Sequence, residues 1–136
     1  MDKYIHTVQY YETDKMGITH HSNYIRWMEE ARCDLLKQVG WPYEKMEELG
    51  VISPVTAVEC KYKISTTYAE KIAIRAKVEE FKGVKLKVSY TMENEAGKIV
   101  FEGKSEHCFL STDGRPMILS KKFPDLDEVL TNAVGV

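Results

Sequence analysis

Cysteine is scarce in this 136-residue chain, and the sequence has neither a long apolar run nor an excess of one charge. Its three cysteines, Cys33, Cys60 and Cys108, are odd in number and widely spaced. That pattern suggests neither a disulfide framework nor a zinc site. We therefore expect three buried thiols.

The charges are nearly balanced, with 19 basic and 21 acidic side chains and a formal net charge of -2. This balance argues against a general nucleic-acid or anionic-membrane surface, so we expect no nucleic-acid partner. No apolar run approaches membrane-spanning length, and the start, residues 1–6, reaches a histidine too early for a signal peptide. We therefore expect no membrane insertion and a cytoplasmic location.

Apolar residues make up 43% of the chain, which fits one domain over residues 1–136 with its own core. Hydrophobic periodicity predicts a strand over 4–11, a helix over 24–39, a short helix over 43–49, and strands over 52–64, 71–79, 84–93 and 98–112. Ser22 or Asn23 is the expected helix cap, and Gly40 the expected stop. In the last strand, Gly103 suggests a bulge or a close backbone approach.

The long predicted helix carries a wide apolar face, and the later strands alternate apolar and charged residues. The helix face comprises Tyr24, Trp27, Met28, Ala31, Leu35 and Val39, broadened by Ile25 and Leu36. One such helix against a meander of antiparallel strands predicts a two-layer α+β fold. Its exposed strand edges favour a homo-oligomer with continuous sheets, whose sites draw residues from two chains.

The segment from Tyr10 to Tyr24 concentrates the residues that suggest chemistry, because it places Asp14, Gly17 and two histidines, His20 and His21, between a strand and a helix. Gly17 supplies backbone freedom to the loop, and the helix start offers unpaired N–H groups and a positive dipole end. A carboxylate facing such donors suits attack on a carbonyl group.

Other readings of these residues remain open. Asp14 alone could form only an Asx turn, and a metal site at His20 and His21 lacks helical ligand spacing. Glu29 and Glu30 are expected on a solvated or ion-paired face, although a carboxylate there could also act in catalysis or support His21.

Lysines gather around the predicted turn at Gly83, namely Lys82, Lys85 and Lys87, and a second pair follows at Lys121 and Lys122. Exposed lysines usually serve only solubility. A nucleotide with phosphates, however, needs fixed cations of this kind.

The pattern Tyr-x-Glu-Thr-Asp-x-x-Gly-x-x-His-His-x-x-Tyr, followed by Glu-Glu-Ala-Arg, resembles the hotdog-fold acyl-CoA thioesterases of the 4-hydroxybenzoyl-CoA thioesterase type, in particular a YbgC-like branch. The resemblance implies a curved antiparallel sheet wrapped around one long central helix, in dimers or tetramers with active sites at the dimer interface.

The same resemblance implies roles for individual residues. Asp14 matches the catalytic carboxylate, Gly17 the loop glycine, His21 the histidine of the YbgC-like branch and Tyr24 the aromatic residue that opens the helix. His20 departs from the Tyr or Phe of many relatives, which affects the expected shape of the acyl pocket. The phosphates of coenzyme A are expected near the turn that carries Lys82 and Lys85.

The predicted function is therefore hydrolysis of an acyl-CoA or acyl-carrier-protein thioester, a reaction that needs no metal or organic cofactor. Asp14 would act as general base or nucleophile, and N–H groups at the start of the Tyr24 helix would bind the thioester oxygen. His21 would orient water, bind the oxyanion or protonate the departing thiolate. The alternatives are a hotdog hydratase or dehydratase and a non-catalytic acyl-CoA-binding module.

Overall fold

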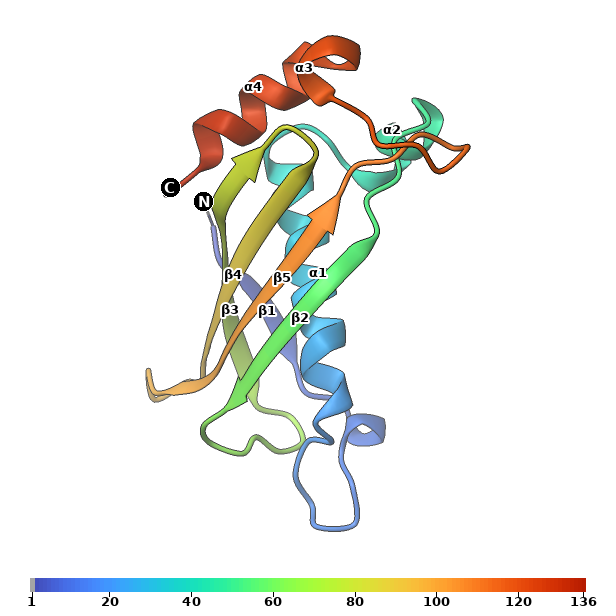
Figure 1. The fold of residues 1–136 in the computed structure, drawn as a ribbon. Helices are drawn as coiled ribbons and strands as arrows, with labels where there is room; N and C mark the ends of the chain where they lie inside the picture. Colours follow the sequence, from blue (N-terminus) through green and yellow to red (C-terminus); the bar gives the residue numbers. More distant parts are fainter. Residues whose placement is uncertain (1) are drawn as a thin grey trace.

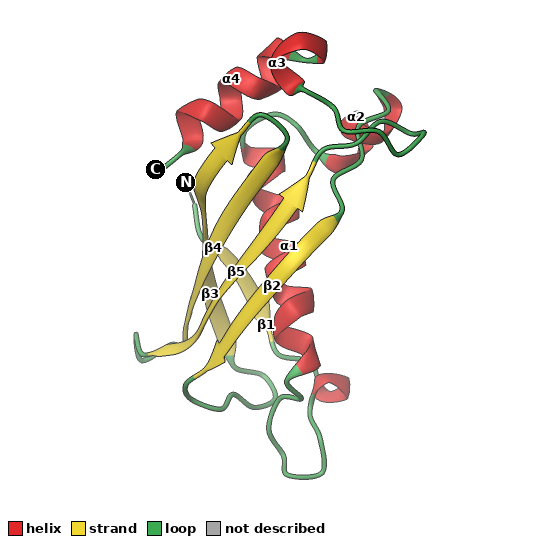
Figure 2. Cartoon of the chain, viewed as in Figure 1, coloured by secondary structure: helices red, strands yellow, loops and turns green. Residues whose placement is uncertain are grey.

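The computed structural model describes residues 2–136 as a helix packed across a strongly twisted sheet (Figure 1). In chain order the elements are β1 (Tyr4–Thr7), the 3-10 turn η1 (Tyr10–Glu12), α1 (Ser22–Gln38), α2 (Tyr43–Glu48), β2 (Val55–Tyr62), β3 (Lys71–Lys82), β4 (Lys85–Glu93), β5 (Ile99–Cys108), α3 (Leu119–Lys122) and α4 (Pro124–Ala133). The strands form one antiparallel sheet in the order β1-β3-β4-β5-β2, with α1 on one face (Figure 2). The expected α+β hotdog fold is confirmed.

Helix α1 forms because its apolar side chains recur on one face, and that face packs against β1 and β3. Its buried apolar residues are Tyr24, Trp27, Met28, Ala31, Leu35 and Leu36. Ile25 was expected to widen the buried face, but its side chain is 44% exposed. The sheet does not cover that side of α1, so the expectation for Ile25 was wrong.

The sheet shows the predicted alternation. Ile72, Ile74 and Val78 of β3 are buried, while Lys71 and Arg75 on the other face of the strand are exposed.

At Gly103 the predicted close approach is confirmed. A Cβ atom there would lie 2.7 Å from the ring of Phe101 and 3.0 Å from the carbonyl oxygen of Glu59. Gly103 pairs in regular register with both neighbouring strands, so it is not the site of a bulge.

Several local expectations were wrong. The first strand ends at Thr7 because residues 10–12 turn as a 3-10 helix, and neither Ser22 nor Asn23 caps α1 because both already lie within it. The last long strand ends at Cys108 rather than 112. Cys33, Cys60 and Cys108 are free thiols that are half-buried rather than fully buried.

Two short helices at the carboxyl end were not anticipated. Helices α3 and α4 lie at the end of the sheet opposite the loop that joins η1 to α1 (Figure 1). They close that end of the core with four buried residues, Leu119, Leu126, Leu130 and Ala133. Within residues 2–136, no helix has the length and apolar character needed to cross a membrane.

Candidate active site

The loop between η1 and α1 turns sharply at Asp14. The N–H of Gly17 donates to the carbonyl of Asp14 at 3.0 Å, and the N–H of Met16 donates to Asp14 Oδ1 at 2.8 Å. Gly17 has a φ of +80°, which glycine adopts without strain. Asp14 therefore does form an Asx turn, but its second oxygen, Oδ2, accepts no hydrogen bond from the described residues.

The far side of this loop is fixed to the segment that follows β2. The N–H of Thr19 donates to the carbonyl of Thr66 at 2.8 Å, and the two threonine hydroxyls lie 2.6 Å apart. Thr67 Oγ1 donates to the carbonyl of Gly17 at 2.8 Å. The loop that carries Asp14 is thus held from both sides.

His20 and His21 are both exposed, with ring centroids 4.3 Å apart. His20 Nδ1 accepts the N–H of Ser22 at 3.2 Å and lies 2.8 Å from the Ser22 hydroxyl. His20 therefore supplies an acceptor for one backbone N–H in the first turn of α1. The N–H of His21 has no partner within residues 2–136, and the N–H of Tyr24 makes only a long bond, 3.4 Å, to the carbonyl of His21. These two N–H groups are the least engaged donors at the start of the helix.

A hollow of about 210 Å³ opens between the start of α1 and the end of β2. It is lined by Ile18, Thr19, His21, Tyr24, Tyr62, Lys63, Ile64 and Ser65. Burial raises the pKa of Tyr24, whose hydroxyl lies 3.0 Å from that of Thr66, so the phenol stays protonated. His21 and Tyr24 thus share one hollow, whereas Asp14, Gly17 and His20 do not line it within a single chain.

Lys82 and Lys85 lie at the β3–β4 turn, at the opposite end of the sheet from the Asp14 loop (Figure 1). Lys82 Nζ pairs with Glu80 at 3.0 Å, and its side chain is 81% exposed. One chain alone therefore does not bring these lysines to the loop.

The two carboxylates of the Glu-Glu-Ala-Arg motif are ion-paired, as expected for such a face. Glu29 accepts a hydrogen bond from the buried Arg32 at 2.8 Å. Glu30 lies 3.1 Å from His6 Nδ1 and accepts the Tyr4 hydroxyl at 2.7 Å, so its histidine partner is His6 rather than His21.

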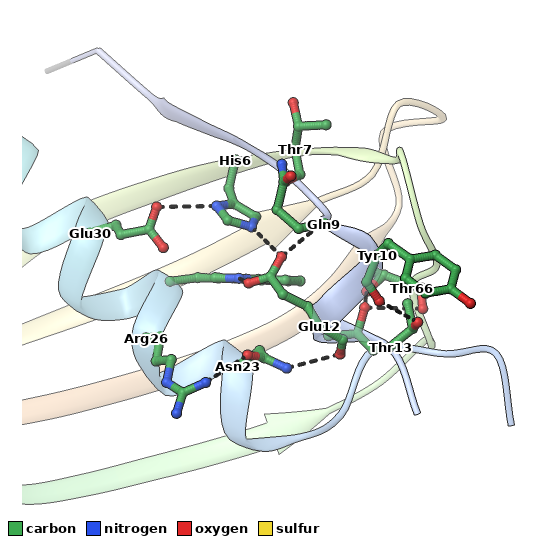
Figure 3. A network of polar contacts seen from close by, with 12 residues as sticks. His6, Thr7, Gln9, Tyr10, Glu12, Thr13, Asn23, Arg26, Glu30 and Thr66 are labelled. Atoms are coloured by element: carbon green, nitrogen blue, oxygen red, sulfur yellow. Dashed lines mark hydrogen bonds and ion pairs between the residues drawn. The ribbon is translucent and has the colours of Figure 1, made fainter. Parts of the chain in front are cut away.

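Sequence reasoning did not single out Glu12, a buried carboxylate two residues before Asp14 (Figure 3). Burial disfavours its charged form, but hydrogen bonds from the Gln9 N–H, Trp27 and His6 outweigh that cost and hold the pKa of Glu12 below its usual value. The available signal was an acidic residue directly after the segment 4–11 that was predicted to be a strand. Within residues 2–136, no three His, Cys, Asp or Glu side chains are grouped so that they could hold a metal ion.

Comparisons with known proteins agree with this architecture. Residues 8–134 match the family model described as the thioesterase-like superfamily. A Bacillus subtilis protein named "Putative acyl-CoA thioesterase YneP" is 38% identical over 119 residues, covering 87% of this chain and 86% of that protein.

Two solved structures are also similar. The DHNA-CoA thioesterase of Staphylococcus aureus has a TM-score of 0.93 and 35% identity, over 96% of this chain and 89% of that chain. A hypothetical protein of Aquifex aeolicus has a TM-score of 0.87 and 34% identity, over 94% and 98%. The YbgC-like branch stays a prediction, but the match over nearly the whole chain shows that this protein belongs to the thioesterase-like superfamily and is a hotdog-fold thioester hydrolase.

Proposed function

We propose that this chain hydrolyses acyl-CoA thioesters and that the segment from Asp14 to Tyr24 is its catalytic centre. The observation that carries the proposal is the state of the Asp14 carboxylate. One oxygen is fixed by the N–H of Met16, and the other accepts no hydrogen bond from the described residues. The loop that carries this carboxylate leads into the start of a 17-residue helix. A held carboxylate with a free oxygen, in a loop that ends at a positive helix end, suits acyl transfer.

In this mechanism the thioester oxygen binds at the start of α1. The N–H groups of His21 and Tyr24 are the donors least engaged within the chain, and the helix dipole adds to their effect as negative charge develops on the oxygen. The free oxygen of Asp14 then takes a proton from a water that attacks the carbonyl carbon, and the C–S bond breaks to release the acid and the thiolate. Alternatively that oxygen attacks the carbon itself and expels the thiolate, and water then hydrolyses the resulting mixed anhydride. The His21 ring orients the water or protonates the thiolate.

The acyl group is proposed to be aromatic. The hollow beside His21 is walled by the rings of Tyr24 and Tyr62, which meet edge to face at 5.3 Å between centroids. Aromatic pairs favour such geometry, so an aromatic acyl group has rings to pack against. The S. aureus relative is named for an aryl substrate, DHNA-CoA, which belongs in the first panel tested.

We further propose that β2 pairs with β2 of a second copy. Strand β2 is an eight-residue edge strand of which all but one residue is exposed, including Val58 and Tyr62 at 41% and 49%. A long exposed edge with apolar side chains is a template for pairing. Light scattering should report a dimer or tetramer, and Val58→Lys should shift it toward monomer.

Such pairing also supports a role for Lys82 and Lys85. The Val55 end of β2 lies toward the β3–β4 turn, because Lys85 pairs with Cys108, whose N–H donates to the carbonyl of Pro54. The Tyr62 end lies beside His21. Antiparallel pairing of two copies therefore carries the partner's lysine turn to the end of the sheet that holds this chain's Asp14 loop, where the substrate's phosphates would bind.

The test is thiol release from a panel of acyl-CoA and acyl-carrier-protein thioesters, with DHNA-CoA, benzoyl-CoA and aliphatic chains compared by kcat/KM. Asp14→Asn should lower kcat by about 1000-fold and leave CoA binding by calorimetry unchanged, because only the reacting oxygen changes. Asp113→Asn, in another exposed loop, is the matched control. Near-normal turnover by Asp14→Asn would refute the proposal. Binding without turnover in the wild type would favour a non-catalytic module.

A further inference from the structure

The side chain of Glu12, near the proposed catalytic loop, is buried and has three polar partners. It is 4% exposed, and its carboxylate accepts hydrogen bonds from the Gln9 N–H at 2.8 Å and from Trp27 Nε1 at 2.7 Å. His6 Nε2 lies 2.8 Å from the same carboxylate. The carboxylate thereby joins three parts of the chain: the η1 turn, helix α1 and strand β1 (Figure 3).

His6 extends this network to a second carboxylate. Its Nδ1 lies 3.1 Å from Glu30 Oε1 on α1, and its ring packs against Trp27 with centroids 4.6 Å apart. Both ring nitrogens lie within hydrogen-bond distance of carboxylate oxygens, one of Glu12 and one of Glu30. The His6 side chain is only 10% exposed, and water therefore competes little for these bonds.

The main chain of Glu12 ties the two ends of the Asp14 loop together. Its carbonyl accepts the N–H of His20 at 2.8 Å and the side-chain amide of Asn23 at 2.9 Å (Figure 3). Residue 12 precedes the loop, residue 20 ends it, and residue 23 lies in the first turn of α1. One residue therefore fixes where the loop leaves and where it meets the helix.

From these contacts we infer that Glu12 is a positioning residue: held by His6 and Trp27, it sets the placement of the Asp14 carboxylate relative to the start of α1. The inference rests on the proposed catalytic role of Asp14. A carboxylate is required at residue 12 because the Gln9 N–H and Trp27 Nε1–H, which can only donate, bond to different oxygens of the side chain. Glutamine would turn an N–H₂ group toward at least one donor and displace the η1 turn.

The test compares Glu12→Gln with Leu126→Ala, a buried leucine on α4 at the far end of the core. Both variants should lower Tm. At a temperature where circular dichroism shows both fully folded, Glu12→Gln should lower kcat by about 10- to 100-fold with KM within about threefold, because misplacement of a reacting group affects the chemical step. Leu126→Ala should keep the wild-type kcat. A wild-type kcat for folded Glu12→Gln, or equal losses in both variants, would overturn the inference.

A second pair of variants covers the case in which Glu12→Gln does not fold. His6→Gln keeps a side-chain N–H that can donate to Glu12, whereas His6→Leu keeps none. The kcat of His6→Gln should exceed that of His6→Leu by about fivefold or more. Equal kcat values would count against positioning through Glu12.

The double variant Asp14→Asn with Glu12→Gln separates this inference from the proposed function. If Glu12 acts through Asp14, adding Glu12→Gln to Asp14→Asn should lower the residual kcat no further. A full additional loss would show that Glu12 acts elsewhere and overturn the inference. Full activity of Asp14→Asn alone would instead refute the proposed function, and would be seen before the double variant is made.

Discussion

Two carboxylates only two residues apart, Glu12 and Asp14, lie in opposite surroundings. Glu12 is buried and its oxygens accept three donors, whereas Asp14 lies in a partly exposed loop with one oxygen bonded and the other unengaged. The histidines differ in burial: His107 is buried, with Nε2 2.6 Å from the Ser105 hydroxyl, whereas His21 is exposed. Groups whose bonding capacity is used hold the fold, and groups left with free capacity are available for chemistry.

Replacing each carboxylate by alanine should change activity and stability in different proportions. Asp14→Ala should lower kcat/KM by about 1000-fold, equivalent to about 4 kcal/mol of activation free energy, and change the free energy of unfolding by less than about 1 kcal/mol. Glu12→Ala should cost roughly 3 kcal/mol of unfolding free energy, because the buried Trp27 N–H and two part-buried partners lose their contact with the carboxylate. Urea denaturation and thiol release measure the two quantities. If both variants lost activity and unfolding free energy in the same proportion, the contrast between the two carboxylates would be wrong.

His107 should make the free energy of unfolding depend on pH. Burial, and then repulsion from Arg32, lower the pKa of His107 to about 3, so the folded protein holds it neutral. The unfolded chain binds a proton near its ordinary pKa of 6.5, so stability is complete above pH 6.5 and is lost as the pH falls toward 3.

Between pH 6 and 5, the His107 contribution should cost about 1 kcal/mol of unfolding free energy per pH unit. Urea denaturation of the wild type and of His107→Gln gives this contribution by difference. Glu12 does not interfere there, because its lowered pKa affects stability only near and below pH 4.5. Identical slopes for the two proteins would show that His107 is not held neutral.

His21→Ala should lower kcat by about 10- to 50-fold, a smaller effect than loss of Asp14, because a nearby acid–base group assists rather than performs the attack. Its Tm should stay close to the wild-type value, since the ring is exposed. His20→Ala is the comparison variant. Because the His20 ring accepts the N–H of Ser22, its loss should lower Tm more than the loss of the His21 ring does. A larger loss of Tm for His21→Ala than for His20→Ala would contradict the distinction between bonded and free groups.

Charge reversal at the lysine turn should give the smallest effect. Lys82→Glu with Lys85→Glu should raise KM for acyl-CoA about three- to tenfold at low salt and less at high salt, because exposed charges are screened. A small thioester without the nucleotide should be unaffected. Lys121→Glu with Lys122→Glu, on α3, is the control, and equal losses on both substrates would argue against a phosphate site.

Much of the fold was predictable because it follows from local patterns. Alternation in β3 and β4 and the apolar stripe of α1 identified those elements, and the spacing of Asp14, Gly17 and His21 indicated the family. Helices α3 and α4 were not predicted because they are short, with 4 and 10 residues. Their buried leucines are too few to show a clear helical periodicity in the sequence. The end of β1 was misjudged because the carboxylate of Glu12 turns the chain back on itself.

The sequence by itself determined the class of the fold, the loop that carries Asp14 and its place before a long helix. Those features depend on neighbouring residues and on side-chain periodicity. Only the tertiary structure decided that Glu12 bonds to His6 and Trp27, that His107 is buried beside Arg32, and that the lysine turn lies away from the loop of its own chain. The reason is physical: how many partners a polar side chain has, and how much water reaches it, depends on segments far away in the sequence.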